Sequence, residues 1–378
     1  MPTSSWPLRD IAPERFLRDY WQRKPLLLRQ ALPGFASPLS RAELFALARG
    51  DAAESRLVVR DGDDWSVRHG PFAARELPAL RQPQWTLLVQ GVDLLHDRVA
   101  AMLQRFRCVP DARLDDIMIS WASDGGGVGP HVDDYDVFLL QAQGRRRWRL
   151  GPVRDTSMRS GQALKLLRHF EPDMDVVVEP GDLLYLPPGW GHDGVALGPC
   201  MTYSVGFRAP PAGELMRQLL WKLADEQPGG ARYSDRGRVD AKVAAHPARL
   251  PDDMVDFLQR AFERLRPGRR AFADALGEIL TEPKGQVWFD TDPTPPAQLR
   301  RALRRGGLRL DRRSRMLYTA DAVMINGERV DAQLGRERLL RRLADHRTLD
   351  AADWAAAGDA LRELLLDWCA QGWTHPRD

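Results

Sequence analysis

Two histidines and an aspartate are the residues of this chain best suited to bind a metal. His131 and Asp133 are separated by one residue, and His192 lies farther along the chain. Two imidazoles and one carboxylate can occupy one face of an octahedral Fe(II), leaving three positions open for a co-substrate and dioxygen. Residues 131–141 are predicted to form a strand, so the side chains of His131 and Asp133 would point to the same face.

A His-x-Asp spacing is weak evidence by itself, because a chain with eight histidines often contains one by chance. Strand alternation supplies the context, since it puts five side chains on one face: His131, Asp133, Tyr135, Val137 and Leu139. A carboxylate buried on such a face is costly unless it is paired or bound to a metal. The surroundings favour a metal site, and a structural His-Asp pair is the alternative.

An arginine is predicted to lie inside the fold near these residues. We expect Gly144 to form a tight hairpin, so that a strand at 146–150 runs back beside the ligand strand. Arg146 would share its face with the apolar Trp148 and Leu150. The intervening side chains, Arg145, Arg147 and Arg149, would face solvent. A buried arginine needs an anion, either a dicarboxylate that also chelates the metal or an internal Asp or Glu.

The elements that position these residues are predicted to be mostly strands. Strands are expected at 26–28, 55–59, 85–89, 116–122, 131–141, 146–150, 175–178, 183–186 and 201–207, with helical segments at 92–108 and 155–168. Glu179-Pro-Gly-Asp182 is a turn, and Gly191 permits a close backbone approach before His192. Short strands with Gly/Pro turns are typical of a sandwich or barrel such as a jelly roll.

The pattern changes at Ala209-Pro-Pro211, after which amphipathic helices are predicted at 212–227, 251–265 and 270–281. In the second of these, apolar residues recur at helical spacing: Met254, Phe257, Leu258, Ala261, Phe262 and Leu265. Such an apolar stripe needs a partner. Either the β domain or a second copy of the chain would cover it.

Residues 283–378 are predicted to form a winged-helix-like unit. Helices are expected at 296–305, 334–344 and 351–370, with strands at 315–319 and 322–325 before an Asn326-Gly327 turn. Eight Arg and one Asp lie between residues 300 and 315, as a nucleic-acid site would require. However, residues 283–378 contain 17 Lys/Arg against 14 Asp/Glu, so we do not expect nucleic-acid binding.

Bulk composition is that of an ordinary soluble protein. The chain has 378 residues, 43% hydrophobic and 28% charged, with a net charge of +3, which suggests two or three domains. No apolar run approaches the ~20 residues of a membrane span, and the start lacks the blocks of a signal peptide. The three cysteines form no C-x-x-C and suit a reducing compartment. We therefore expect a cytoplasmic protein.

Taken together, these motifs resemble those of the JmjC/cupin oxygenases. The segments concerned are His131-Val-Asp133, Arg146, Pro180-Gly-Asp-Leu-Leu-Tyr-Leu-Pro-Pro-Gly-Trp-Gly-His192 and Tyr203-Ser-Val-Gly-Phe-Arg208. Gly125-Gly-Gly-Val-Gly-Pro-His-Val-Asp-Asp-Tyr-Asp-Val-Phe138 and Gly144-Arg-Arg-Arg-Trp-Arg149 narrow the resemblance to the bacterial ribosomal oxygenases within that family. The resemblance covers essentially the whole chain.

The resemblance implies an α+β chain of three domains. A JmjC/cupin double-stranded β-helix (jelly roll) would cover residues 1–209, a helical dimerisation domain 210–282 and a winged-helix-like domain 283–378. The implied activity is Fe(II)-, 2-oxoglutarate- and O2-dependent β-hydroxylation of an arginine in large-subunit (50S) ribosomal protein sixteen. The alternatives are histidyl hydroxylation, lysine demethylation or a non-enzymatic cupin/winged-helix regulator.

Site residues carry over from the resemblance one by one. The iron ligands would be His131, Asp133 and His192, and Arg146 would bind the far carboxylate of 2-oxoglutarate. The 2-oxoglutarate pocket would also be lined by Met118 and Ser120. Candidates for the substrate side-chain pocket are Tyr135, Asp124 and Ser204. The implied partners are a ribosomal protein and a second copy of the chain, bound through the helical middle. No membrane is expected.

Overall fold

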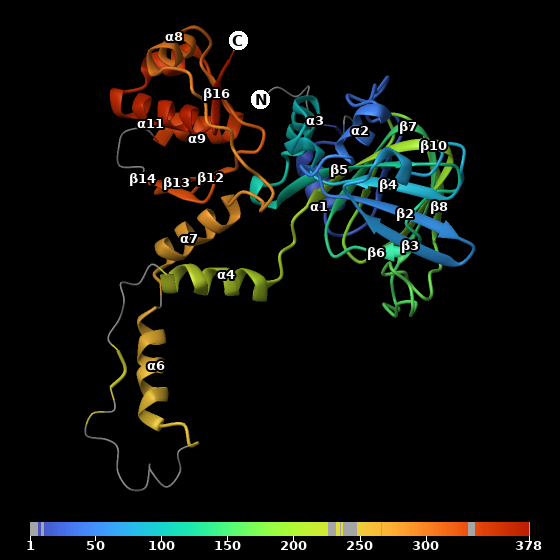
Figure 1. Cartoon of the computed structure of the whole chain (residues 1–378), viewed down its shortest axis with the longest axis horizontal. Coiled ribbons are helices and arrows are strands. Elements are labelled where there is room, and N and C mark those ends of the chain that lie inside the picture. The colour runs from blue at the N-terminus through green and yellow to red at the C-terminus, as the bar shows by residue number, and fades with distance from the viewer. Residues whose placement is uncertain are drawn as a thin grey trace. The chain divides into compact units, whose positions relative to one another are not determined.

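Strands fill the first half of the chain and helices predominate in the second half (Figure 1). A computed structural model describes residues 7–8, 11–225, 232–234, 236, 248–265, 267–331 and 337–377. The chain divides into two units, Met1–Ala209 and Pro210–Asp378. None of the helices in the described ranges is both long enough and apolar enough to span a bilayer.

The described residues of the first unit form ten strands and three α-helices, with four short 3-10 turns between them. The helices are α1 (Pro13–Asp19), α2 (Arg41–Leu47) and α3 (Asp97–Leu103), and the turns are η1 (Ala74–Glu76), η2 (Val92–Leu94), η3 (Gln104–Phe106) and η4 (Asp111–Arg113). The strands are β1 (Leu26–Leu28), β2 (Ser55–Asp61), β3 (Asp64–His69), β4 (Trp85–Val89), β5 (Leu114–Ala122), β6 (His131–Val132), β7 (Val137–Pro152), β8 (Met174–Val178), β9 (Leu183–Leu186) and β10 (Trp190–Phe207).

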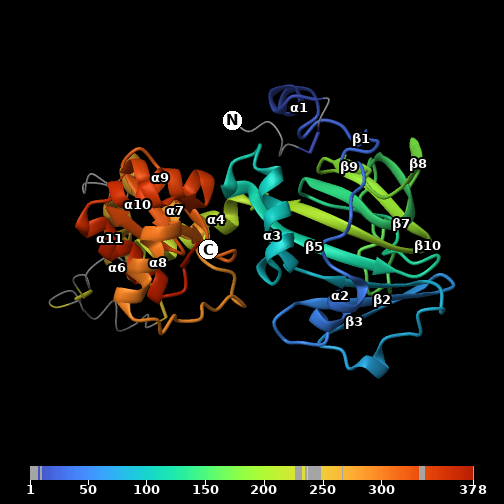
Figure 2. The same cartoon turned by 90° about the horizontal axis from the view of Figure 1, so that it is seen from above.

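Two long strands organise this unit. β7 and β10, of 16 and 18 residues, pair antiparallel along most of their length, and Figure 2 shows them side by side. The network runs in the order β1-β9-β7-β10-β5-β4-β2-β3, with β8 joined to β7 and β6 joined to β10. This antiparallel arrangement agrees with the predicted jelly roll.

The hairpin predicted at Gly144 is wrong. β7 continues through this residue and stays paired with β10, whose register shifts between Leu197 and Met201. Gly144 has a φ of +64°, and a Cβ there would lie 2.2 Å from the carbonyl oxygen of Pro199. A residue with a side chain is therefore excluded by sterics and by backbone conformation. The glycine allows β7 to distort beside the irregularity in β10 without reversing.

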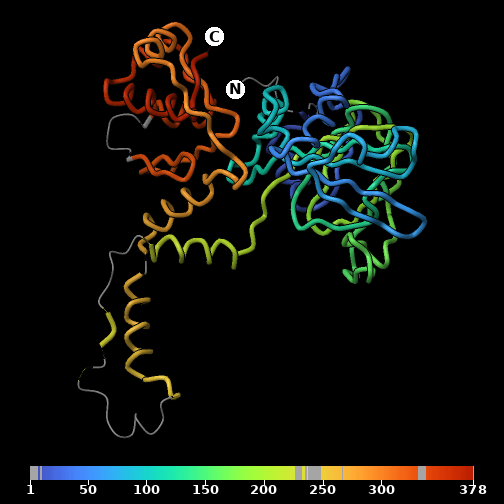
Figure 3. The backbone as a smooth tube through the Cα atoms, viewed as in Figure 1, coloured from blue at the N-terminus to red at the C-terminus, as the bar shows by residue number. Residues whose placement is uncertain are grey.

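Two other predicted elements differ in the structure. The strand expected at 131–141 is interrupted, because β6 ends at Val132 and β7 begins at Val137. The helix expected at 155–168 is an irregular loop whose one bridge joins Met158 to Leu167. There, Gly161 has a φ of +76°, and the amide of Leu167 donates to the carbonyl of Pro130. Tertiary contacts outweigh helical spacing in this segment, which Figure 3 traces in green.

Two apolar clusters lie on opposite sides of the β7–β10 pair. The larger cluster joins strand residues such as Phe138 and Tyr185 to Phe16 of α1. The smaller cluster consists of Val137, Leu139, Trp148, Leu150, Val178, Leu184 and Leu186, and we call it the inner cluster. Because alternate residues of β7 enter different clusters, both faces of this strand are buried near residues 137–140.

The described residues of the second unit form helices, a β-hairpin extended by a third strand, and a small antiparallel sheet of short strands in the order β15-β11-β16. Its helices are α4 (Ala212–Asp225), α6 (Asp252–Arg264), α7 (Arg269–Thr281), α8 (Pro296–Gly306), α9 (Glu337–His346), α10 (Ala351–Ala356) and α11 (Asp359–Ala370). Its strands are β11 (Leu308–Leu310), β12 (Met316–Tyr318), β13 (Ala322–Ile325), β14 (Glu328–Asp331), β15 (Thr348–Leu349) and β16 (Thr374–Pro376).

Helices α4 and α7 pack together through Leu219, Leu223, Ala275 and Ile279. Gly277 of α7 lies against Met324 of β13, so α7 also contacts the three-stranded sheet β12–β13–β14. By contrast, α6 has no buried residue. The predicted domain boundary at 282/283 falls directly after α7. The three-domain division stays a prediction.

The predicted winged-helix elements are present with small differences. Asn326 and Gly327 have φ of 50° and 87° and connect β13 to β14, as expected for a tight Asn-Gly hairpin turn. The helix predicted at 351–370 is two helices, because Ala357 and Gly358 have extended backbones. The first residues of the helix predicted at 334–344 lie outside the described residues.

Candidate metal centre

Strand pairing brings the two candidate histidine ligands together. His131 of β6 lies directly opposite His192 of β10, and their ring centroids are 4.1 Å apart. Asp133 follows the end of β6, and its Oδ2 lies 3.6 Å from Nε2 of His192. One ligand atom from each residue lies within 4.8 Å of the others. Metal–ligand distances near 2 Å fit one ion between them.

Backbone carbonyls orient both imidazoles. Nδ1 of His131 lies 2.9 Å from the carbonyl oxygen of Gly129, and Nδ1 of His192 lies 3.1 Å from that of Trp190. A carbonyl oxygen only accepts, so Nδ1 of each ring must donate. Each Nε2 then keeps its lone pair for a metal, the arrangement in which a second hydrogen bond fixes a ligating histidine.

The electrostatics of the three residues suit a bound cation. Burial raises the pKa of Asp133, although His131 and a hydrogen bond from the Tyr135 hydroxyl act in the opposite direction. Burial, followed by the charge of His131, holds the pKa of His192 well below its usual value. His192 is therefore held in its neutral, ligating form, and the carboxylate of Asp133 lies where burial opposes its charge. A divalent ion would offset that cost.

Arg146 lies on the same face of the sheet as His192. Arg146 pairs with Ala196 of β10 and Leu150 pairs with His192, and cross-strand partners share a face. The side chains of Arg146, Trp148 and Leu150 are buried, whereas Arg145 and Arg147 are exposed. The predicted orientation of Arg146 is therefore confirmed, although the strands that flank it are β10, which carries His192, and β8, and not the segment that carries His131.

The guanidinium of Arg146 lacks the anion that burial demands. Within the part of the chain that the structure describes, its Nε and Nη2 have no hydrogen-bond partner. The group lies 5.6 Å from the centroid of the Trp148 ring, beside the inner cluster. An unpaired buried cation is strongly destabilising. The two free donors match a carboxylate, because a guanidinium fork binds both carboxylate oxygens. An internal Asp or Glu, the alternative, is not found among the described residues.

Met118 and Ser120 lie on the inner face beside this position. Ser120 pairs with Thr202, and Met118 pairs with Ser204, which in turn pairs with Leu139 of the inner cluster. This register places Met118, Ser120 and Ser204 on one side of the sheet. Ser120 and Ser204 are short side chains, and Met118 is flexible.

The three candidates for a substrate pocket lie in different settings. The Tyr135 side chain is 42% exposed, and its hydroxyl reaches Asp133. Ser204 lies on the inner face opposite Met118. Asp124 is exposed in the loop after β5, where its Oδ1 accepts from the Gly198 amide at 2.7 Å. Tyr135 is thus next to the metal ligands, whereas Asp124 is anchored at the bulge of β10.

Sequence reasoning missed one charged residue of this site. Arg56 pairs with Leu88 across β2 and β4, and Leu88 pairs with Ser120. The Nη2 of Arg56 lies 3.9 Å from Sδ of Met118, and its charge partly offsets the rise in pKa that burial causes at Asp133 and Tyr135. No local motif identifies Arg56. The signal is the register of three paired strands, which a single sequence does not reveal.

The loop after β7 closes around the second histidine. A Cβ on Gly191 would lie 2.8 Å from the Val153 side chain and 2.9 Å from the Phe170 ring. Glycine is therefore needed immediately before His192, as the sequence predicted. Leu166 similarly lies against Gly129, whose carbonyl orients His131. The loop at 153–172 thus supports the backbone on both sides of the metal centre.

Comparisons with known proteins agree with this geometry. Residues 101–215 match the family model of the JmjC domain, and residues 259–375 match the ROXA-like winged helix. The ribosomal protein uL16 3-hydroxylase of Escherichia coli is 37% identical over 96% of this chain and 93% of its own length.

Solved structures of the Escherichia coli ribosomal oxygenase YcfD give the same result. One has a TM-score of 0.82 at 35% identity and covers 95% of this chain and 96% of its own. Another, in complex with cobalt and 2-oxoglutarate, has a TM-score of 0.78 at 36% identity. It covers 95% of this chain and 96% of its own. The chain therefore belongs to the JmjC-domain ribosomal oxygenases with a winged-helix C-terminal domain.

Proposed function

We propose that this chain is an Fe(II)- and 2-oxoglutarate-dependent protein hydroxylase that β-hydroxylates an arginine of ribosomal protein uL16. The observation that carries the proposal is a two-histidine, one-carboxylate centre that shares its face with a buried arginine lacking an anion. The uL16 3-hydroxylase at 37% identity supports the substrate. Acting on a ribosomal protein, the enzyme would work in the cytoplasm.

His131, Asp133 and His192 would hold the iron through two Nε2 atoms and a carboxylate oxygen. When bound, iron with 2-oxoglutarate and O2 supplies the oxidising power that hydroxylates an unactivated C–H bond and releases succinate and CO2. The Gly129 and Trp190 carbonyls keep the imidazoles in the ligating tautomer.

Arg146 would bind the far carboxylate of 2-oxoglutarate through Nε and Nη2, the two donors that lack partners. Met118 and Ser120 would line the same pocket from β5. The inner cluster supplies an apolar wall around the guanidinium, so water is excluded and the ion pair with the co-substrate is strengthened.

Tyr135, Asp124 and Ser204 would contact the substrate side chain. An arginine substrate needs an acceptor for its guanidinium, and the exposed carboxylate of Asp124 retains acceptor capacity beyond its bond to Gly198. Tyr135, exposed beside Asp133, would form a wall between substrate and metal. Ser204 would contact the substrate from the inner face.

A homodimer through the helical middle is the second part of the proposal. Three apolar side chains of α6, Val255, Leu258 and Phe262, are 46%, 68% and 56% exposed, and Trp221 of α4 is 67% exposed. Solvated apolar stripes of this size are rare on monomers. A second copy of the chain would remove these apolar side chains from solvent if its own α6 and α4 packed against them.

Substrate-coupled turnover tests the activity. The purified chain with Fe(II), 2-oxoglutarate and a uL16 peptide is expected to add one oxygen to an arginine, with an equal amount of succinate. A peptide with lysine in place of that arginine is the matched control. Demethylation of a methyl-lysine peptide, or oxidation of a histidine peptide in preference to uL16, would contradict the arginine assignment. No turnover with any peptide would instead favour a non-enzymatic regulator.

A further inference from the structure

Helix α8 has one buried face and one strongly basic face. Leu299 and Leu303 are buried against the other helices of the second unit. Arg301, Arg304 and Arg305 are exposed on the opposite side, and we call them the α8 basic face. Their i, i+3 and i+4 spacing places neighbouring side chains about 5–6 Å apart at Cβ.

Several arginines of the second unit are paired with acids: Arg300 with Glu363, Arg313 with Asp311, Arg329 with Asp274, Arg342 with Asp353 and Arg362 with Asp359. Among the described residues, no hydrogen bond or ion pair is found for any side chain of the α8 basic face. The near balance of 17 basic and 14 acidic residues therefore does not describe the charge at this face.

The helix dipole explains only part of this arrangement. Cations in the last turn are stabilised by the negative end of the dipole, which accounts for Arg304 and Arg305. Arg301 lies in the middle of the helix and gains little. Like charges at i, i+3 and i+4 repel, so the three guanidiniums destabilise one another in the free protein. An extended polyanion would relieve that repulsion at all three positions together.

We propose that the α8 basic face binds the phosphate backbone of RNA. Guanidinium forks match phosphate oxygens, and a row of them along a helix follows a row of phosphates. The choice of RNA rests on the proposed function, because a ribosomal protein substrate is assembled on RNA. A basic face would repel a basic ribosomal protein, but it would attract the RNA that such a protein contacts.

Binding of a labelled RNA hairpin to the full-length protein tests this site, by fluorescence anisotropy over a series of salt concentrations. The variant Arg301→Gln/Arg304→Gln/Arg305→Gln removes three charges while keeping helix propensity. Its affinity is expected to fall roughly tenfold or more near 0.1 M salt. The slope of log affinity against log salt should fall by about two to three, at 0.7–0.9 per phosphate contact.

A matched control removes three exposed arginines of the first unit, as Arg49→Gln/Arg75→Gln/Arg81→Gln. This variant has the same net charge as the α8 variant and is expected to keep its affinity for RNA. Equal losses in the two variants would overturn the proposal, since general charge would then explain the binding. Full RNA affinity in the α8 variant would overturn it as well.

Two further measurements separate RNA binding at this face from the binding of an acidic protein and from a failure of the proposed function. Polyglutamate of equal charge is expected to compete poorly with the hairpin, and equal competition would overturn the assignment to RNA in favour of an acidic protein. Hydroxylation of a free uL16 peptide should be unchanged in the α8 variant, which also shows that it folds. If the unmodified protein does not hydroxylate the peptide, the proposed function fails while the RNA measurement still decides this site.

Discussion

At the scale of single residues, the most informative side chain is one without a partner. Arg146 is buried to 5% exposure, and its Nε and Nη2 have no hydrogen-bond partner in the described part of the chain. A fold that keeps a guanidinium in this state must gain stability from a ligand that is absent when the protein is free. The site is therefore shaped by its co-substrate as much as by its metal.

Replacing Arg146 tests this assignment. Arg146→Ala is expected to raise the KM for 2-oxoglutarate roughly 10- to 100-fold, because a charge-assisted pair worth about 1.5–3 kcal/mol is lost. Arg146→Lys should recover only part of the loss, since an ammonium lacks the planar fork. The KM is measured by succinate release. Arg147→Ala, on the solvent side of the same strand, is the control, and an unchanged KM in Arg146→Ala would remove this residue from the pocket.

At the scale of elements, the site depends on two irregularities that face each other in β7 and β10. Gly144 lies where a Cβ would meet the carbonyl of Pro199 at 2.2 Å, and Arg146 follows two residues later. The distortion in β7 therefore lies two residues from Arg146, the side chain proposed to bind the co-substrate.

Gly144→Ala is expected to destabilise the protein by roughly 2–4 kcal/mol, because a steric clash adds to the cost of a left-handed φ. Gly161→Ala is a matched control. Its φ is also positive, at +76°, but nothing lies within 4 Å of the added Cβ, so only about 1 kcal/mol is expected. Urea denaturation measures both values. Equal losses would show that close contact with β10 does not matter at Gly144.

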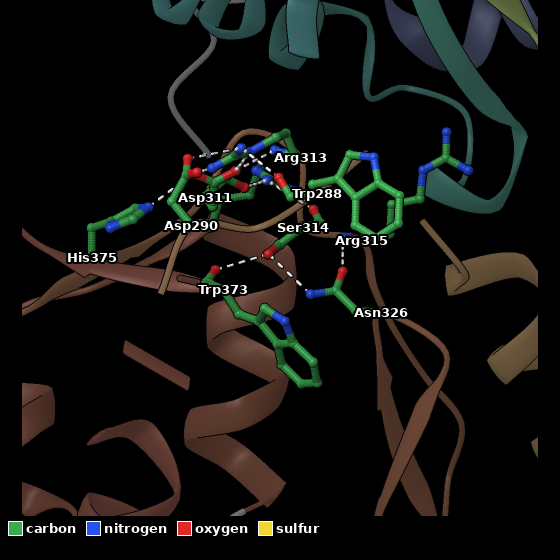
Figure 4. A network of polar contacts seen from close by, with 10 residues as sticks. Trp288, Asp290, Asp311, Arg313, Ser314, Arg315, Asn326, Trp373 and His375 are labelled. Atoms are coloured by element: carbon green, nitrogen blue, oxygen red, sulfur yellow. Dashed lines mark hydrogen bonds and ion pairs between the residues drawn. The ribbon is translucent and has the colours of Figure 1, made fainter. Parts of the chain in front are cut away.

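A buried polar network links the short strands of the second unit (Figure 4). Asp311 accepts from Arg313 at 2.8 Å and from Nε2 of His375 at 2.8 Å. Burial alone would raise the pKa of Asp311, but the hydrogen bonds from His375 and Arg313 outweigh it and hold the pKa far below its usual value. The carboxylate therefore anchors β16 beside β11.

This depressed pKa predicts how stability responds to acid. Because the folded pKa lies below the unfolded value near 4, the carboxylate stabilises the fold fully above that value. The contribution decreases as pH falls below about 4. Asp311→Asn is expected to cost roughly 3 kcal/mol at pH 7. It should also flatten the decline in unfolding free energy between about pH 5 and 3. The same decline in unfolding free energy in the variant as in the unmodified protein would contradict this role of Asp311.

Local sequence signals predicted some elements and failed at others for physical reasons. β4, β9 and β13 were predicted with their observed bounds, because each is a short apolar run closed by turn residues. Gly144 was misread because glycine marks a bulge as readily as a turn. The segment 155–168 has helical spacing, but the Leu166 side chain lies against Gly129 and the Leu167 amide donates to the carbonyl of Pro130. Arg56 escaped notice because only strand register brings it to Met118.

At the scale of the whole molecule, the apolar stripe of α6 has no cover within the described chain, where α6 has no buried residue. If the proposed dimer forms through α6, Leu258→Glu/Phe262→Glu is expected to convert it into a monomer, because charges would be buried at the interface. The control Gln259→Glu/Arg260→Gln changes the net charge equally on another face of α6. Light scattering gives the mass. A dimer in the first variant would exclude α6 as the interface.

In the proposed function, His131, Asp133 and His192 bind an iron that couples 2-oxoglutarate turnover to substrate hydroxylation. The most direct measurement is the ratio of hydroxylated uL16 peptide to succinate, with and without His131→Ala, by mass spectrometry. We predict a ratio near one for the unmodified protein and no hydroxylated peptide for the variant, with His69→Ala as an active control. Peptide-coupled turnover that survives in His131→Ala would contradict the account.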